Sequence, residues 1–191
     1  MVEKSVEGRP LKESELISNA RKGVVGAYEK LVLENQHVAL RVAYLVVRSH
    51  AEAEDVTQEA FVKAYQSLGR FRDGEPFTPW LLKIVRNEAL NRRRGSGRRE
   101  QATLRLAAEP SSGDAAPSPE TAAVISEERR VLLDAIESLP SRYRAVIEAR
   151  FLLELSESET ATMLGLKPGT VKSRTSRGLS RLRELVGGSD A

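Results

Sequence analysis

The chain of 191 residues contains no cysteine, which excludes a disulfide scaffold, a thiolate zinc site and a cysteine nucleophile. Its two histidines, His37 and His50, are too few for a histidine-rich metal site. The longest uninterrupted apolar run, residues 42–47, is six residues long, whereas a membrane span needs about 20. No apolar segment near the N-terminus precedes a cleavage site, so no secretory signal is expected. We therefore predict a soluble, cytoplasmic protein that needs no cofactor or metal.

The charged residues are strongly segregated along the chain, although the net charge is only +3. Seven basic residues and one acidic residue lie between positions 83 and 99, and six basic residues and one acidic residue lie between 167 and 185. Four acidic residues without a basic one lie between positions 52 and 59. Two basic elements suit a polyanion such as nucleic acid, because neutralised phosphates release counterions. For either element alone, a solvated helix face is the alternative explanation.

One internal segment, residues 109–119, is rich in proline and serine and carries no large apolar side chain. Such a composition cannot bury a core and is typical of a flexible linker. We therefore predict two domains, residues 12–98 and 121–187, joined by a flexible linker over residues 99–120. Apolar residues recur at helical spacing in both domains, and alternating strand patterns are absent. The predicted fold class is all-α, with two small helical domains and about seven helices in total.

Several helix ends are marked by local signals. Thr78 followed by Pro79 predicts a helix start, because threonine caps the free N–H groups and proline suits the first helical position. The pair at residues 118–119 repeats this pattern. Pro140 is predicted to end a helix, and Ser141 to cap the next one, whose apolar face is predicted to contain Tyr143, Val146, Ile147 and Phe151.

Residues 156–185 have the pattern of a helix-turn-helix. Ser156 and Glu159 form a capping box, and Gly165 stands where a helix end requires left-handed backbone. This geometry places the second helix in the major groove of DNA; an αα-hairpin with a solvated basic face is the alternative. Four side chains near its start are predicted to reach base edges or phosphates: Lys172, Ser173, Ser176 and Arg177. Its inward face is predicted to contain Val171, Gly178, Leu179, Leu182 and Leu185.

The first basic element combines amide, guanidinium and aromatic side chains. Asn87 and Asn91 are four residues apart and therefore share one helix face. Together with nearby arginines and aromatic rings they suit unstacked bases and a phosphate backbone. The alternative readings differ by residue: Trp80 belongs to the core, and Phe77 forms a hydrophobic staple at the helix start.

These two elements lie in segments that resemble the extracytoplasmic-function (ECF) branch of the bacterial sigma-70 factors. Residues 51–94 resemble region 2, with EDVTQEAF, FTPWL and an Asn-x-x-x-Asn pair before a basic run. Residues 134–185 resemble region 4, with LPSRYR and GTVKSRTSRG. The resemblance implies a sigma factor that binds core RNA polymerase, recognises the −35 and −10 promoter elements and promotes strand opening. It also implies control by an anti-sigma factor.

The resemblance further implies roles for individual residues. In region 2, an acidic helix docks on the β′ clamp helices of the polymerase, and region 4 meets its β flap. The implied docking residues are Asp55, Gln58, Glu59 and Phe61. The implied −10 contacts are Phe71, Phe77, Asn87, Asn91, Arg92 and Arg93. Arg150 is added to Lys172, Ser173, Ser176 and Arg177 as a −35 contact.

Two other classes of function, a free-standing regulator and an enzyme, explain the sequence less well. A free-standing helix-turn-helix regulator would explain the C-terminal domain, but not the acidic helix or the asparagine pair. An enzyme is not expected, because the chain shows no metal-ligand spacing, no glycine-rich phosphate loop and no nucleophile with its base.

Overall fold

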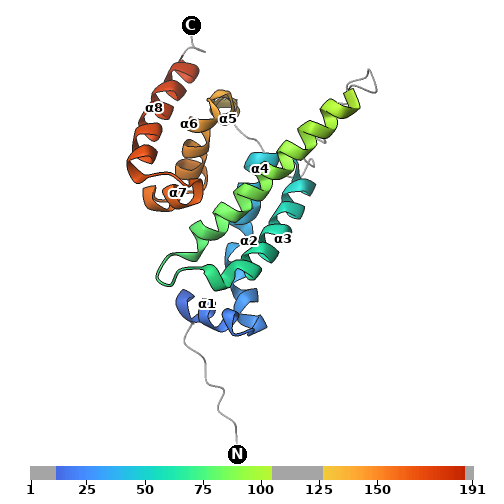
Figure 1. Ribbon diagram of the computed structural model, residues 1–191. Helices are drawn as coiled ribbons and strands as arrows, with labels where there is room; N and C mark the ends of the chain where they lie inside the picture. Colours follow the sequence, from blue (N-terminus) through green and yellow to red (C-terminus); the bar gives the residue numbers. More distant parts are fainter. Residues whose placement is uncertain (1–11, 105–126, 188–191) are drawn as a thin grey trace, which may run out of the picture.

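The structure is a computed structural model, and it describes residues 12–104 and 127–187. Within these residues the secondary structure is entirely helical, which confirms the predicted fold class (Figure 1). The predicted linker segment 109–119, and with it the expected helix start at residues 118–119, lies outside the described residues.

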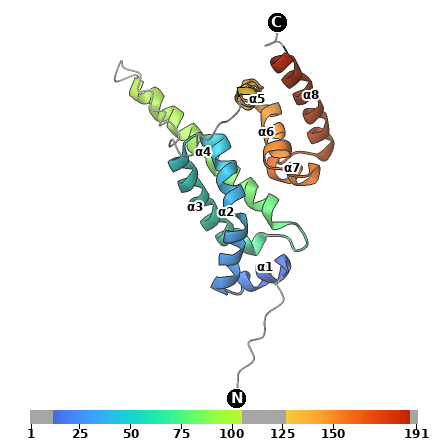
Figure 2. The same cartoon turned by 180° about the vertical axis from the view of Figure 1, so that it is seen from behind.

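The helices form two groups (Figures 1 and 2). The N-terminal group contains α1 (Glu13–Arg21), α2 (Val25–Val47), α3 (His50–Ser67), a 3₁₀ turn η1 (Leu68–Arg70) and α4 (Phe77–Leu104). The C-terminal group contains α5 (Glu127–Ser138), α6 (Ser141–Ile147), a π-helical segment η3 (Glu148–Leu152), α7 (Glu157–Leu164) and α8 (Pro168–Gly187). Helix α4 therefore continues six residues beyond position 98, where we placed the end of the first domain.

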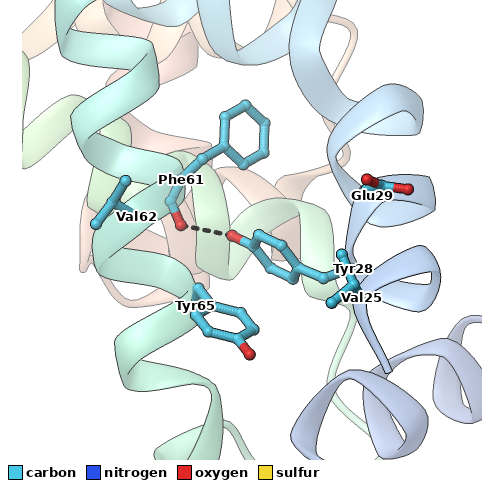
Figure 3. Close-up of a pocket in the computed structure, with 6 residues that line it drawn as sticks. All are labelled: Val25, Tyr28, Glu29, Phe61, Val62 and Tyr65. Carbon is cyan, nitrogen blue, oxygen red and sulfur yellow. Dashed lines mark hydrogen bonds between the residues drawn. The ribbon is translucent and has the colours of Figure 1, made fainter. Parts of the chain in front are cut away.

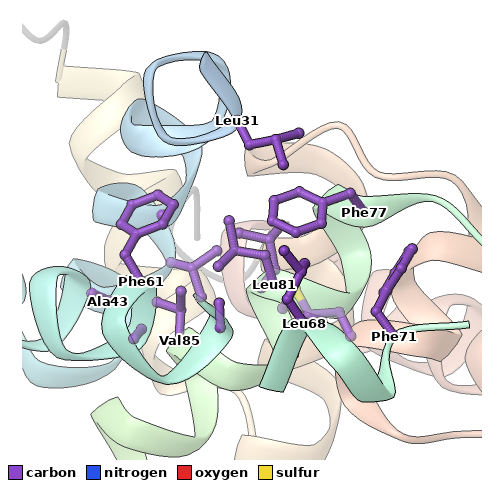
Figure 4. Close-up of a cluster of buried hydrophobic side chains, with 14 of the residues drawn as sticks. Leu31, Ala43, Phe61, Leu68, Phe71, Phe77, Leu81 and Val85 are labelled. Atoms are coloured by element: carbon purple, nitrogen blue, oxygen red, sulfur yellow. The ribbon is translucent and has the colours of Figure 1, made fainter. Parts of the chain in front are cut away.

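Helices α2, α3 and α4 pack around a common apolar core (Figure 4). Leu31 of α2, Val56 of α3 and Leu81 of α4 are all fully buried there. Burying each such side chain stabilises the fold by about 1.5–3 kcal/mol. Helices α1 and α2 at the start of the chain both contribute to this core.

Three aromatic rings close the end of this core where α4 begins. Phe77 is fully buried and Phe71 nearly so, whereas Trp80 is only partly buried. The rings of Phe71 and Trp80 meet edge to face, with centroids 5.1 Å apart. The core prediction for Trp80 therefore holds only in part, whereas Phe77, for which a staple was the alternative, is a fully buried core residue.

The start of α4 differs from the prediction. The helix begins at Phe77, whose N–H donates to the Glu13 carboxylate of α1 at 2.9 Å. The Thr78 hydroxyl donates instead to the side-chain oxygen of buried Asn35, at 2.6 Å. Thr78 therefore does not cap α4. The carboxylate of Glu13 accepts the first N–H group of the helix, and the Thr78 hydroxyl is engaged by Asn35.

The start of α6 also differs from the prediction. Pro140 is the N-cap, and its carbonyl accepts the N–H groups of Tyr143 and Arg144. Ser141 is the first helical residue and makes no capping hydrogen bond. The predicted serine cap was wrong by one position, because Pro140 has the extended backbone that the cap position requires.

The helix-turn-helix is confirmed in its local details. Ser156 and Glu159 form both hydrogen bonds of the capping box. Gly165 ends α7 with a φ of +65°, and the N–H of Leu166 returns to the carbonyl of Ala161 at 2.9 Å. The hydrogen bonds from Ser156 also lower the pKa of the Glu159 carboxyl, which keeps it charged at the helix start.

Two apolar side chains of the C-terminal group are more exposed than predicted. Leu185 lies near the end of α8, where it is 43% exposed rather than part of the inward face. Phe151 was expected to follow Tyr143 and Ile147 inward but is 50% exposed. Phe151 lies in the π-helical segment η3, whose wider turn shifts its face away from that of α6.

Gly178 is the point of closest approach between α8 and α6. A Cβ atom built there would lie 3.0 Å from the Ile147 side chain. We predict that Gly178→Val destabilises the protein by about 1–3 kcal/mol in urea unfolding, because the extra carbons overpack this contact. Gly169→Ala on the same helix is the control, since nothing lies within 4 Å of its Cβ. Equal stability of the Gly178→Val variant and the native chain would contradict the prediction.

Candidate partner and nucleic-acid interfaces

The exposed face of α3 carries three of the four predicted docking residues. Asp55, Gln58 and Glu59 are exposed and lie within one turn of each other. Phe61 is only 8% exposed, and its ring belongs to the core (Figure 4). The structure therefore separates Phe61 from the acidic face.

A basic residue from another helix joins this acidic face. Arg92 of α4 lies 2.7 Å from the Glu59 carboxylate and 3.5 Å from that of Asp55. The acidic stretch contains no base in the sequence, but the packing of α4 against α3 supplies one. Two of the predicted docking residues, Asp55 and Glu59, thus meet a predicted −10 residue in one ion-pair cluster.

An apolar groove adjoins the acidic face (Figure 3). It has a volume of about 400 Å³ between α2 and α3. Val25 and Val62 on its rim are more than half exposed. In its wall, the hydroxyl of Tyr28 donates to the Phe61 carbonyl at 2.5 Å, and burial raises the pKa of Tyr28 to about 12. The hydroxyl therefore stays a proton donor at neutral pH.

Sequence reasoning did not identify this groove. Its signal was present in α3, where Val62 and Tyr65 follow Gln58 and Glu59 at helical spacing and so continue the same outward face. The apolar pair was hidden among the core residues of the same helix, and only the packing against α2 distinguishes the two faces.

The predicted −10 residues are divided between surface and interior. Asn87, Asn91 and Arg93 are exposed on α4, whereas Phe71 and Phe77 are buried at 5% and 0%. The structure does not bring these two rings to the surface that carries the asparagines.

The loop before α4 is held by a residue that the sequence did not reveal. Arg21 of α1 donates to the carbonyls of Leu68 and Phe71 and forms an ion pair with Asp73 at 2.6 Å. These contacts link the loop to α1 across about 50 positions of sequence, as the separations of 47, 50 and 52 residues show.

The predicted −35 residues lie on the first turns of α8 and beside it. Lys172, Ser173, Ser176 and Arg177 are all exposed. A shallow hollow of about 330 Å³ brings Arg150 together with Lys172 and Ser176. Thr175, Ser180 and Arg183 line the same hollow and were not predicted. The sequence could have indicated them, because residues three, four or seven positions from Lys172 or Ser176 lie on the same face of a helix.

In the described residues there is no group of three histidine, aspartate or glutamate side chains that could hold a metal ion. None of the described helices combines the length and apolar character that a bilayer crossing requires.

Two known protein families match this chain, one over the N-terminal group of helices and one over the C-terminal group. The sigma-70 region 2 family matches residues 31–99, and the sigma-70 region 4 family matches residues 129–182. The RNA polymerase sigma-H factor of Pseudomonas aeruginosa is 36% identical over 180 residues, which cover 91% of either chain. The ECF RNA polymerase sigma-E factor of Escherichia coli is 37% identical over 184 residues, which cover 92% of this chain and 93% of the relative.

Two solved structures share the fold. A sigma factor, RpoE of Bartonella quintana in complex with the anti-sigma factor NepR, matches with a TM-score of 0.65 and 26% identity, over 85% of this chain and 98% of that one. CnrH, solved in complex with the cytosolic domain of CnrY, matches with a TM-score of 0.66 over 92% of this chain and 97% of that one. At 23% identity this second match shows the fold alone.

Over the described residues, a helix-turn-helix in one group of helices and a basic, asparagine-bearing helix in the other are typical of a two-part DNA-binding protein. The chain belongs to the ECF sigma factors of the sigma-70 family. Members of this family are transcription initiation factors and not enzymes, and they bind core RNA polymerase and promoter DNA. The predictions of family, of function and of these partners are thereby confirmed.

The hollow beside α8 leads to a prediction for Arg183, which was not among the predicted contacts. We expect Arg183→Gln to weaken binding of polymerase holoenzyme to every −35 sequence alike and to reduce the salt slope of log K by about 0.9, because one phosphate contact is lost. Binding is measured by fluorescence anisotropy at several salt concentrations. Lys172→Gln is the comparison, since loss of a base contact changes the preference between sequences. An unchanged salt slope for Arg183→Gln would contradict this assignment.

Proposed function

We propose that this protein acts in the cytoplasm, where it docks on core RNA polymerase through the acidic face of α3 and the adjoining groove. Helix α4 contacts the −10 element, and helix α8 contacts the −35 element. One observation carries the proposal: each group of helices presents one exposed polar or basic helix, and the acidic face lies beside the first of them.

Strand opening is assigned to the exposed face of α4. Extruding a base from the duplex costs a few kcal/mol, and hydrogen bonds together with stacking on aromatic side chains offset that cost. Asn87 and Asn91 supply amide groups at the surface. Of the three aromatic residues in this region, Trp80 keeps an accessible part of its ring, whereas Phe71 and Phe77 support it from below.

We infer that an anti-sigma factor controls this protein. Support comes from the Bartonella quintana sigma factor, whose structure was solved with an anti-sigma factor bound and which matches most of this chain. The exposed apolar side chains of the groove, Val25, Val62 and Tyr65, also favour a protein partner, because an exposed apolar patch promotes association.

The test of the proposal is run-off transcription from a promoter library with purified core RNA polymerase. We expect transcripts that share a −35 and −10 pattern and that require the added protein. Binding to the library without core-dependent initiation would favour the free-standing regulator instead.

The asparagine face leads to a second test. We expect Asn87→Ala to reduce open-complex formation by about tenfold or more while binding to a −35 duplex stays unchanged, because a hydrogen-bonded base contact contributes about 1–3 kcal/mol. Potassium permanganate footprinting of the melted strand measures the effect. Asn19→Ala on α1 is the control, since Asn19 lies on another helix. Equal melting by both variants would show that Asn87 does not contact the −10 element.

Replacing Arg92 should change the affinity for core polymerase and the affinity for the promoter in opposite directions. Arg92→Ala removes the base that neutralises Asp55 and Glu59, so binding to core polymerase should tighten by up to about fivefold, the range expected for an exposed ion pair. The same change should weaken promoter binding, because one cationic contact is lost. Core affinity is measured by titration of labelled protein, and Asp55→Ala/Glu59→Ala should lower it. A loss of core affinity in Arg92→Ala would contradict the prediction.

A further inference from the structure

One arginine holds the start of the loop that precedes α4, residues 71–76. The guanidinium of Arg21, the last residue of α1, uses three different nitrogen atoms for this. Nε donates to the Leu68 carbonyl at 3.0 Å, Nη1 to the Asp73 carboxylate at 2.6 Å, and Nη2 to the Phe71 carbonyl. A lysine could not reproduce this set of contacts, because its single ammonium group lacks the planar fork of donors. The start of the loop is therefore fixed by the shape of the guanidinium and not only by its charge.

The other end of α1 holds the other end of this loop. Glu13, the first residue of α1, accepts the N–H of Phe77 at 2.9 Å. Glu13 and Arg21 stand at the two ends of a helix of nine residues, which places them about 12 Å apart along its axis. Figures 1 and 2 both show α1 beside the loop. One short helix thus spans the loop and fixes both of its ends.

Helix α1 is placed by the core, whereas the loop has little support of its own. Three side chains of α1 are at most 4% exposed and belong to the buried cluster of α2, α3 and α4: Leu16, Ile17 and Ala20. Residues 72–76 of the loop are all exposed. The N–H of Glu75 reaches the carbonyl of Arg72 at 3.4 Å, which is longer than an ordinary hydrogen bond. The loop therefore takes its position from α1.

The two backbones that α1 anchors carry the rings that contact Trp80. The ring centroids of Phe71 and Trp80 are 5.1 Å apart, and those of Phe77 and Trp80 are 5.6 Å apart. Both phenylalanine rings are buried, whereas Trp80 is only partly buried. A shift of either backbone would therefore change the support of the ring in this cluster that stays accessible.

We propose that Arg21 and Glu13 are positioning residues for Trp80. They hold the backbones of Phe71 and Phe77, whose rings set the orientation in which Trp80 stacks on an unpaired base of the −10 element. The stacking role of Trp80 rests on the function proposed above, whereas the positioning of its ring in the free chain does not. Loss of these contacts should impair strand opening and leave −35 binding intact, because α8 belongs to the other group of helices.

The first test follows the ring of Trp80 in the free protein. Trp80 is the only tryptophan of the chain, so tryptophan fluorescence reports on this ring alone. We expect Arg21→Lys to shift the emission to longer wavelength and to increase quenching by acrylamide, because the ring loses part of its support. Lys22→Gln is the matched control, since it removes the neighbouring exposed charge of α1. Native fluorescence in Arg21→Lys would overturn the positioning.

Glu13 offers a conservative variant for the other end of α1. Glu13→Gln should keep the native fluorescence of Trp80, because its amide oxygen still accepts the N–H of Phe77. Glu13→Ala removes the acceptor and should change the fluorescence in the same direction as Arg21→Lys. Equal fluorescence of Glu13→Gln and Glu13→Ala would overturn the role of Glu13.

A variant in the loop controls for loss of folding. The side chain of Asp73 is 84% exposed, so Asp73→Ala removes one of the Arg21 contacts without touching the core. We expect a smaller change of Trp80 fluorescence in the same direction, with the native midpoint of urea unfolding. A native fluorescence signal in Asp73→Ala, together with a lowered urea midpoint in Arg21→Lys, would show that Arg21 has only a structural role.

Permanganate footprinting with core polymerase measures the effect on strand opening. We expect Arg21→Lys to reduce open-complex formation by about tenfold or more, the effect of losing one charge-assisted hydrogen bond. Binding to a −35 duplex should stay unchanged, and Lys22→Gln should melt the promoter like the native chain. Because lysine keeps the positive charge, normal melting by Arg21→Lys with impaired melting by Arg21→Gln would indicate a phosphate contact and overturn the positioning.

The two measurements separate the positioning from the proposed function. If the fluorescence of Trp80 changes as expected but the native chain opens no promoter with core polymerase, the positioning stands and the proposed function fails. If the native chain opens the promoter and the variants match it in fluorescence and melting, the function stands and the positioning fails. If the variants change the fluorescence but melt the promoter normally, the role in strand opening is overturned.

Discussion

The burial of one face of α4 is the interaction on which the rest of the structure depends. Phe77, Leu81 and Val85 recur at helical spacing and are fully buried against α2 and α3. Because this face is buried, the rotation of α4 is set, and Asn87 and Asn91 must point outward. The same helix also supplies Arg92 to the acidic face of α3 and the surface on which α7 packs. A single amphipathic helix therefore joins the core, the acidic face of α3 and the contact between the two groups.

Electrostatics in this protein are organised by proximity in space rather than along the chain. The acidic residues of α3 and the basic residues of α4 lie in separate segments of the sequence. In the structure, Arg92 of α4 nevertheless forms ion pairs with Asp55 and Glu59 of α3. The proposed docking face and the proposed −10 surface therefore share one charge cluster, so a charge brought to one surface changes the field at the other. An isolated exposed pair contributes little to stability, which leaves such a cluster free to exchange partners at small cost.

The helix-turn-helix is held by contacts of one kind inside its own group and is attached to α2 by contacts of another kind. The capping box at Ser156 and the left-handed turn at Gly165 hold α7 and α8 in a set geometry, and the close approach of Gly178 to Ile147 joins α8 to α6. These contacts all lie within the C-terminal group. Its contact with α2 instead includes a buried carboxylate, Glu148, that opposes full burial. The contacts inside the C-terminal group are therefore apolar packing and helix caps, whereas its contact with α2 depends on a charged group whose burial carries a cost.

The sequence alone determined the features that depend on neighbours a few residues away. The capping box, the turn at Gly165 and the helical spacing of the core residues involve contacts within about one turn of helix, and the region 2 and region 4 motifs identified the family. The tertiary structure decided the rest. It showed that Thr78 bonds to Asn35 across 43 positions, that Phe71 and Phe77 are buried, and that Arg48 reaches Glu148 across 100 positions. These contacts follow from how whole helices pack, and packing brings together residues whose separation in the chain carries no pattern to read.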